Sequence, residues 1–260
     1  HNPIHNLSQT AIQAIHETAD GLLWLATNYG IEKLDRRTRK FTPYVYDPNN
    51  PHSLGAGTNF LAIDEDSSGN LWMGGNGNAG LNRFDRASER FTTYRHDPND
   101  PNSLSDSRDN VLAIRIDADD IVWVGTQNGG LNRFDPKTET FRAYRHSPDD
   151  PNSPGDDNVR VIHISSSGIL WLGSWYKGLT QFDPRTERFT RYQHDPKNVK
   201  NSLAANAIYA IYEDRVGTLW IATSAGLSQL DRTTSSFTTY REKDGLASAF
   251  IRGILEDEQG

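Results

Sequence analysis

Two sets of side chains in this sequence have the chemistry to hold a ligand. The first is Trp175-Tyr176-Lys177, where two aromatic rings lie beside a cation in a polar stretch. Such rings offer stacking area to a sugar, and the lysine can hold an anionic substituent. The alternative, that Trp175 packs over a neighbouring part of the fold, stays open. Tyr29 and Gln127 occupy corresponding turns elsewhere in the chain and are further candidates.

The second set consists of Arg160, Tyr209 and Arg252, which precede equivalent pairs of small and apolar residues. If these positions lie together, two arginines can bind a carboxylate or a sulfate through paired hydrogen bonds. The interpretation that we favour is that they form salt bridges between blades and hydrogen bonds with buried carboxylates.

The sequence contains no recognisable pattern of metal-binding or catalytic residues. His96, His146 and His194 occupy the same place in three copies of a repeat, which separates them in space. There is no cysteine, so disulfides and thiolate metal sites are excluded. The sequence contains no Ser-His-Asp elbow, phosphate-binding loop or metal triad. It therefore indicates no catalytic residue, no metal and no cofactor.

The overall composition excludes two kinds of partner. The net charge is −7, so no basic surface for nucleic acid is expected. No apolar run approaches the roughly 20 residues that span a bilayer, so this segment is not expected to insert into a membrane. Hydrophobic residues make up 35% of the chain and aromatic residues 10%, which leaves large rings to supply much of the core.

A repeat of about fifty residues must position the candidate side chains. Five tryptophans in similar surroundings are 48, 51, 48 and 49 residues apart: Trp24, Trp72, Trp123, Trp171 and Trp220. Self-similarity at this period indicates one supersecondary unit copied along the chain. The copies are repeats at about 7–44, 59–94, 110–144, 158–192 and 206–240.

Each repeat predicts four short antiparallel strands. In the third copy they are 110–117, 121–126, 131–135 and 141–144, separated by turns rich in Gly, Asp and Pro. One such sheet, apolar on both faces, is not stable alone. Stacked sheets around an axis bury both faces, so the sequence predicts an all-β protein, a β-propeller of four-stranded blades. The repeated tryptophan is expected to pack between blades.

An incomplete sixth repeat follows the five full ones. Residues 249–257 predict a first strand, and the partial unit runs over 249–260. Either the chain is part of a larger propeller, which we favour, or five blades close on themselves. In the first case open blade faces would contact a second copy of the chain or a partner propeller.

The repeat resembles the two-component regulator propeller repeat. The similarity lies in the series Ala-Ile-x-Glu-Asp, Gly-x-Leu-Trp-x-Gly-Thr and Gly-Leu-x-x-Phe-Asp, and in linkers such as Asp97-Pro-Asn-Asp-Pro-Asn-Ser-Leu104. Such repeats occur in periplasmic sensor halves of hybrid histidine kinases and of some diguanylate cyclases. The resemblance implies a periplasmic or other extracytoplasmic sensor, membrane-tethered in the full-length protein, whose ligand is often a carbohydrate.

Three functions are therefore considered. The favoured one is a non-catalytic, ligand-sensing propeller of a bacterial signal-transduction receptor, with an oligosaccharide or another small molecule as its ligand. The first alternative is a protein-interaction scaffold. The second is a propeller enzyme that cleaves a polysaccharide by hydrolysis or by elimination. Its catalytic groups would be single acids, or a histidine and a glutamate, at the mouth of the propeller's central channel.

Overall fold

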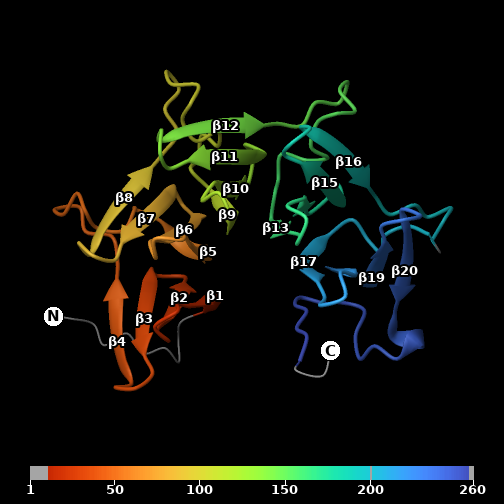
Figure 1. Ribbon diagram of the computed structural model, residues 1–260, viewed down its shortest axis with the longest axis horizontal. Coiled ribbons are helices and arrows are strands. Elements are labelled where there is room, and N and C mark those ends of the chain that lie inside the picture. Colours follow the sequence, from red (N-terminus) through yellow and green to blue (C-terminus); the bar gives the residue numbers. More distant parts are fainter. Residues whose placement is uncertain (1–10, 200, 258–260) are drawn as a thin grey trace. The chain divides into compact units, whose positions relative to one another are not determined.

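The strands form five separate antiparallel sheets of four strands each (Figure 1), in a computed structural model that describes residues 11–199 and 201–257. We call the sheets blades 1 to 5 in chain order. Strands are short and follow one another with tight turns, which confirms the all-β prediction and the blade architecture. The only helical element among the described residues is the 3-10 turn η2 (Glu242–Asp244).

The strand bounds follow the predicted repeats closely. Blades 1 and 2 contain β1 (Ile12–Glu17), β2 (Leu23–Thr27), β3 (Ile31–Asp35), β4 (Lys40–Tyr44), β5 (Thr58–Glu65), β6 (Leu71–Asn76), β7 (Leu81–Asp85) and β8 (Arg90–Tyr94). Blade 3 contains β9 (Val111–Ile116), β10 (Val122–Thr126), β11 (Leu131–Asp135) and β12 (Thr140–Tyr144). Blades 4 and 5 contain β13 (Val161–Ile164), β14 (Leu170–Gly173), β15 (Leu179–Asp183), β16 (Arg188–Tyr192), β17 (Ile208–Glu213), β18 (Leu219–Thr223), β19 (Gly226–Asp231) and β20 (Ser236–Tyr240).

Contacts divide the chain into two compact units, His1–Ala143 and Tyr144–Gly260. In the first unit, β5 contacts both β1 and β9, so the first strands of blades 1, 2 and 3 lie side by side. In the second unit, β13 and β14 contact β17 in the same way. Each unit therefore stacks consecutive blades through their first strands.

Small residues in the second strand of a blade allow this close approach. A Cβ added to Gly74 would lie 2.3 Å from a methyl carbon of Val111 in the next blade. A Cβ added to Gly173 would lie 2.6 Å from a methyl carbon of Ile208. Both distances are far below van der Waals contact, so glycine is needed for the spacing of the blades.

The repeated tryptophans of blades 1, 2 and 4 pack against the next blade, as predicted. Trp24 is 1% exposed, and its ring centroid lies 5.4 Å from that of Tyr44 and 5.2 Å from that of Phe84 in blade 2. Trp72 makes the equivalent contact with Phe134 at 5.5 Å. Burying one such ring stabilises the fold by about 2–3 kcal/mol by area. These side chains therefore belong to the scaffold.

The indole N–H groups of these tryptophans are satisfied unequally. Trp72, Trp123 and Trp220 donate to aspartates six positions earlier in the chain, with N···O distances of 2.9, 2.8 and 2.8 Å. Trp24 and Trp171 are buried, yet their Nε1 atoms have no hydrogen-bond partner. The position six residues before them is a threonine or a serine, whose shorter side chain does not replace the aspartate.

One face of blade 1 differs from the same face in blade 2. Ile15 is 63% exposed and Phe41 is 39% exposed, whereas the equivalent Ile63 and Phe91 are 5% and 3% exposed. In blade 2 this face is covered by the Trp24 side of blade 1, with which Ile63 and Phe91 share a core cluster. Blade 1 therefore exposes apolar side chains whose equivalents in blade 2 are buried.

The predicted strand at 249–257 is absent from the structure. A strand requires a pairing partner, and no second strand of a sixth sheet is present among the described residues. The segment nevertheless docks on blade 5 as β17 docks on blade 4. Ile251 N donates to Thr223 O at 3.2 Å, and Ile208 N donates to the equivalent Ser174 O at 3.0 Å. Residues 7–10 and 258–260 of the predicted repeats lie outside the described residues.

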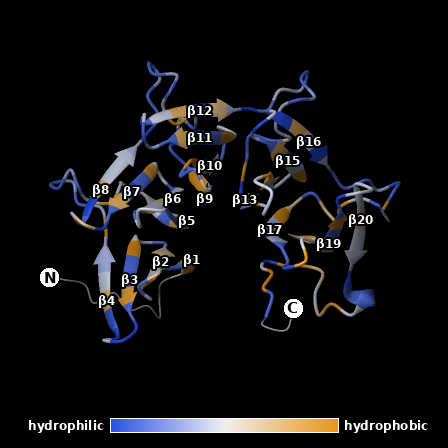
Figure 2. Cartoon of the chain, in the orientation of Figure 1, coloured by the Kyte–Doolittle hydropathy of each residue, from blue (hydrophilic) through white to orange (hydrophobic). Residues whose placement is uncertain are grey.

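Polar linkers join the fourth strand of one blade to the first strand of the next (Figure 2). In three of them a histidine holds the loop closed. The Nδ1 atoms of His96, His146 and His194 lie 2.7, 2.8 and 2.7 Å from backbone carbonyl oxygens eight or nine residues later in the same linker. These histidines are loop clamps that use the same geometry in successive linkers.

Candidate functional site

Side chains from blades 4 and 5 form one cluster of rings and guanidinium groups in the second unit. Arg160 directly precedes β13, Trp175 lies in the turn between β14 and β15, and Tyr209 is in β17. The Arg160 guanidinium carbon lies 4.1 Å from the Trp175 ring centroid and 5.9 Å from that of Tyr209. The Trp175 and Tyr209 rings meet edge to face at 5.6 Å.

The docked C-terminal segment extends this cluster. The Phe250 ring lies edge to face with Tyr209 at 4.9 Å, and the Arg252 guanidinium carbon lies 5.2 Å from the Phe250 centroid. We call these five residues the Arg–aromatic cluster: Arg160, Trp175, Tyr209, Phe250 and Arg252. Phe250 was missed in the sequence because its position in the repeat carries no large residue in the other copies. Its place two residues before Arg252 was the available signal.

The cluster is accessible and its cations repel each other. Arg160 and Arg252 are exposed, Phe250 is 43% exposed, and Trp175 and Tyr209 are half-buried. Partial loss of hydration lowers the pKa of the Arg160 guanidinium, Tyr209 opposes that shift, and the charge of Arg252 adds to it. Two guanidinium groups that repel each other therefore lie over the rings of one aromatic cluster.

The partners of Arg160, Arg252 and Trp175 distinguish between the interpretations of these residues. Among the described residues, neither Arg160 nor Arg252 has a carboxylate within ion-pair distance, so the expectation of salt bridges to buried carboxylates is wrong at these two positions. Trp175 does pack against the neighbouring blade, through Tyr209, and Arg160 covers one of its faces. Trp175 is consequently part of a composite surface instead of an isolated stacking ring.

The remaining candidates are not part of this cluster. Tyr176 and Lys177 share the turn with Trp175 and are exposed, Tyr176 at 68%. Tyr29 is 59% exposed in the turn between β2 and β3 of the first unit. Gln127, in the turn between β10 and β11, accepts a hydrogen bond from Asn110 Nδ2 at 2.8 Å. Among these residues, Tyr176 and Lys177 are the ones that lie next to Trp175 in the chain.

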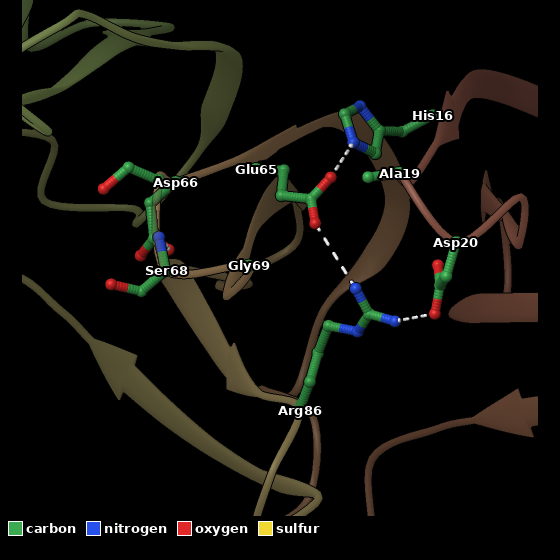
Figure 3. Close-up of a pocket in the computed structure, with 9 residues that line it drawn as sticks. His16, Ala19, Asp20, Glu65, Asp66, Ser68, Gly69 and Arg86 are labelled. Carbon is green, nitrogen blue, oxygen red and sulfur yellow. Dashed lines mark hydrogen bonds and ion pairs between the residues drawn. The ribbon is translucent and has the colours of Figure 1, made fainter.

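An open pocket of about 610 Å³ lies between blades 1 and 2 of the first unit (Figure 3). Its charged groups are linked to one another in a chain. His16 Nε2 lies 3.1 Å from Glu65 Oε2, Arg86 Nη1 lies 3.4 Å from Glu65 Oε1, and Arg86 also contacts Asp20. The hydrogen bond from Thr18 and the ion pair with Arg86 hold the pKa of Asp20 below its ordinary value, against a smaller opposing effect of burial. Because these groups satisfy each other, the pocket offers little to a ligand.

A contact like that of His16 with Glu65 recurs between other blades. His163 Nε2 lies 3.7 Å from Glu213 Oε2, and at the next equivalent position Tyr212 donates to Glu256 Oε2 at 2.9 Å. Repetition at equivalent positions of blades 1, 4 and 5 indicates structural contacts to the segment that follows each blade, not a single acid–base pair. Among the described residues, no group of three or more His, Cys, Asp or Glu side chains has the arrangement of a metal site.

Comparison with known proteins confirms the resemblance of the repeat. Residues 6–29 and 202–225, in the first and fifth repeats, match the family model described as two component regulator propeller. The sequence matches none of the curated proteins with which it was compared. Within residues 11–199 and 201–257 there is no helix long and apolar enough to cross a bilayer.

Solved structures of bacterial sensor domains resemble the chain. The extracellular domain assigned to the hybrid two component system BT3049 from B. thetaiotaomicron is 25% identical, with a TM-score of 0.74, over 87% of this chain and 29% of that chain. The extracellular domain of BT4673 from the same organism, assigned to a one component system, is 21% identical with a TM-score of 0.62, over 96% of this chain and 40% of that chain. This chain thus spans less than half the length of these relatives.

An enzyme also has this fold. Virginiamycin B lyase from Staphylococcus aureus is 15% identical with a TM-score of 0.64, over 89% of this chain and 70% of that chain. At this identity the likeness concerns the fold alone.

Proposed function

We propose that this chain is the ligand-sensing propeller of an extracytoplasmic, membrane-tethered receptor in bacterial signal transduction, and that its ligand is of carbohydrate type. The matched repeats and the likeness to the BT3049 extracellular domain support the sensing role. The observation that carries the ligand-binding role is the Arg–aromatic cluster. It combines accessible ring surface with two cations that have no carboxylate partner among the described residues.

The cluster suits a saccharide better than a reacting substrate. Rings that meet edge to face leave C–H and ring surface for the apolar side of a sugar, while guanidinium groups donate hydrogen bonds to its oxygens. Arginine stays protonated at neutral pH, so neither guanidinium group can act as a general acid or base. We therefore propose a non-catalytic function, in contrast to the lyase that shares the fold.

Calorimetric titration of the chain with a panel of neutral and acidic oligosaccharides tests this function. We expect at least one saturable binder, and we expect Trp175→Ala to weaken it by about tenfold or more without unfolding the protein, since stacking on one ring contributes roughly 0.5–1.5 kcal/mol beyond its buried area. Tyr29→Ala, which removes a more exposed ring from the corresponding turn in the first unit, is the matched control and should leave the affinity unchanged. The proposal fails if no saccharide in a broad panel binds.

We also propose that the five blades are part of a larger propeller. Supporting this are the exposed Ile15 and Phe41 on blade 1 and the docked segment at 251–257. In that arrangement, the tryptophan side of a further blade covers Ile15 and Phe41, as blade 1 covers Ile63 and Phe91 of blade 2. The chain alone should then self-associate, and light scattering should show a smaller mean mass for the double variant Ile15→Ser/Phe41→Ser. A parent chain that stays monomeric at high concentration would contradict it.

A further inference from the structure

The two guanidinium groups of the Arg–aromatic cluster differ from the arginines that face acids elsewhere in the second unit. Arg232 Nη2 lies 2.8 Å from Glu213 Oε1, and Arg215 Nε lies 3.7 Å from Glu256 Oε2. Arg160 and Arg252 instead lie over aromatic rings, with no carboxylate partner among the described residues. In a chain of net charge −7, these two cations are thus left without the acids that neutralise their neighbours.

The electrostatic cost of this arrangement is released by an anion. The rings remove part of the hydration of Arg160, and Arg252 repels it, so both effects lower the pKa of Arg160. An oxyanion between the two guanidinium groups would replace the lost hydration with charge-assisted hydrogen bonds and cancel the repulsion. The free protein therefore holds these cations in a state that an anion stabilises.

The aromatic floor also fixes the direction in which the cations can bind. Arg160 is held over Trp175 and Tyr209 at once, so its planar donor edge is oriented before a ligand arrives. Arg252 is similarly held over Phe250, whose ring contacts Tyr209. Oriented guanidinium groups favour carboxylate and sulfate, which accept paired hydrogen bonds.

We propose that the Arg–aromatic cluster is a subsite for the anionic group of an acidic saccharide, a carboxylate or a sulfate ester carried on a sugar ring. Arg160 and Arg252 bind the oxyanion, and the accessible edges of Trp175 and Phe250 contact the ring that carries it. This inference rests on the proposed ligand-sensing function and specifies the class of ligand.

The test compares three oligosaccharides of equal length by calorimetric titration at low and high salt. They are a galacturonate trimer, a sulfated galactose trimer and a neutral galactose trimer. The two acidic compounds distinguish carboxylate from sulfate as the source of the charge. We expect at least one of them to bind about tenfold or more tightly than the neutral trimer, with an affinity that falls as salt increases.

Substitutions then assign the effect to the two arginines. Arg160→Gln and Arg252→Gln should each weaken binding of the acidic trimer by about tenfold or more, because hydrogen bonds to charged groups contribute more than neutral ones. Arg160→Lys, which keeps the charge but not the paired donors, should recover part of the loss. Arg188→Gln, an exposed arginine in β16 outside the cluster, is the matched control and should bind as the parent does.

The outcomes separate this inference from the proposed function. Equal binding of acidic and neutral trimers, unchanged in both glutamine variants but weakened by Trp175→Ala, would overturn the anionic subsite and leave saccharide sensing in place. Absence of binding by all three trimers, together with the failure of the broader panel, would overturn both.

Discussion

Replacing Ser165 with aspartate should stabilise the protein. Trp171 is 2% exposed and its Nε1 atom has no hydrogen-bond partner, whereas the equivalent Trp123 donates to Asp117 Oδ2 at 2.8 Å. The turns that hold these two positions have the same backbone hydrogen bonds. Ser165 N donates to Ile169 O at 2.9 Å, and Asp117 N donates to Ile121 O at 3.1 Å. An aspartate at 165 is therefore positioned to reach the indole of Trp171.

The magnitude follows from what the indole gains. An unsatisfied buried donor costs about 1–3 kcal/mol, and part of that is recovered when a carboxylate accepts it. Asp214 shows that such a carboxylate stays ionised. Burial raises its pKa, but hydrogen bonds from Trp220 and Thr218 outweigh burial and hold the pKa below its ordinary value. The negative charge of the nearby Glu213 would repel the new carboxylate and reduce this gain. We therefore expect Ser165→Asp to raise the free energy of unfolding by about 1–2 kcal/mol.

Urea unfolding followed by far-ultraviolet circular dichroism measures the change at neutral pH. Ser165→Asn is the matched control, since its amide has one oxygen and cannot serve both Ile169 N and the indole; it should gain little. The reverse change, Asp117→Ser, should cost about 1–3 kcal/mol. The reasoning would be refuted if Ser165→Asp and Ser165→Asn unfolded at the same urea concentration, or if Asp117→Ser had no effect.

Three further predictions concern the scaffold. Burial raises the pKa of Asp64, against a smaller lowering by Arg115, so the Asp64 carboxyl loses its proton at lower pH in the unfolded state, and its own contribution to stability falls as pH rises above about 4. In urea titrations Asp64→Asn should therefore gain stability relative to the parent as pH rises above about 4, and a difference that does not change with pH would contradict this. Gly173→Ala should lower the thermal midpoint by several degrees, because its Cβ would meet Ile208 at 2.6 Å; an unchanged midpoint would show that the blades can separate. Ile15→Ser should cost less than about 1 kcal/mol in urea unfolding and Ile63→Ser more than about 2 kcal/mol, since only the second is buried, and equal losses would count against the exposed face.

Much of the fold could be predicted from the sequence because the same repeat unit occurs five times. Repetition identified the strands, the tryptophans between blades and the turns. It also concealed two facts. Thr18 and Ser165 replace the aspartate of the other repeats, so the indole N–H groups of Trp24 and Trp171 have no acceptor. The sequence alone does not show that these aspartates accept hydrogen bonds from the tryptophans. The segment at 249–257 has the sequence of a strand but lacks a pairing strand among the described residues.

The site could be predicted only in part. The sequence shows Arg160, Tyr209 and Arg252 at equivalent positions of the repeat, and the structure brings them together with Trp175. The stacking of Arg160 on Trp175 could not be predicted, because it depends on the distance between a strand end and a turn in the same blade. Phe250 was not predicted, because no repeat position marks it.

Tryptophan signals can locate the binding of a saccharide ligand at the Arg–aromatic cluster. The chain has six tryptophans, and of these only Trp175 lies in the cluster, so the indole N–H signals of a ¹⁵N-labelled sample report on the site separately from the scaffold. On titration with the tightest-binding oligosaccharide, we predict a saturable shift of the Trp175 signal, assigned by its loss in Trp175→Phe, with small changes in the other five. Saturable binding that leaves the Trp175 signal in place while a scaffold tryptophan shifts would contradict the account.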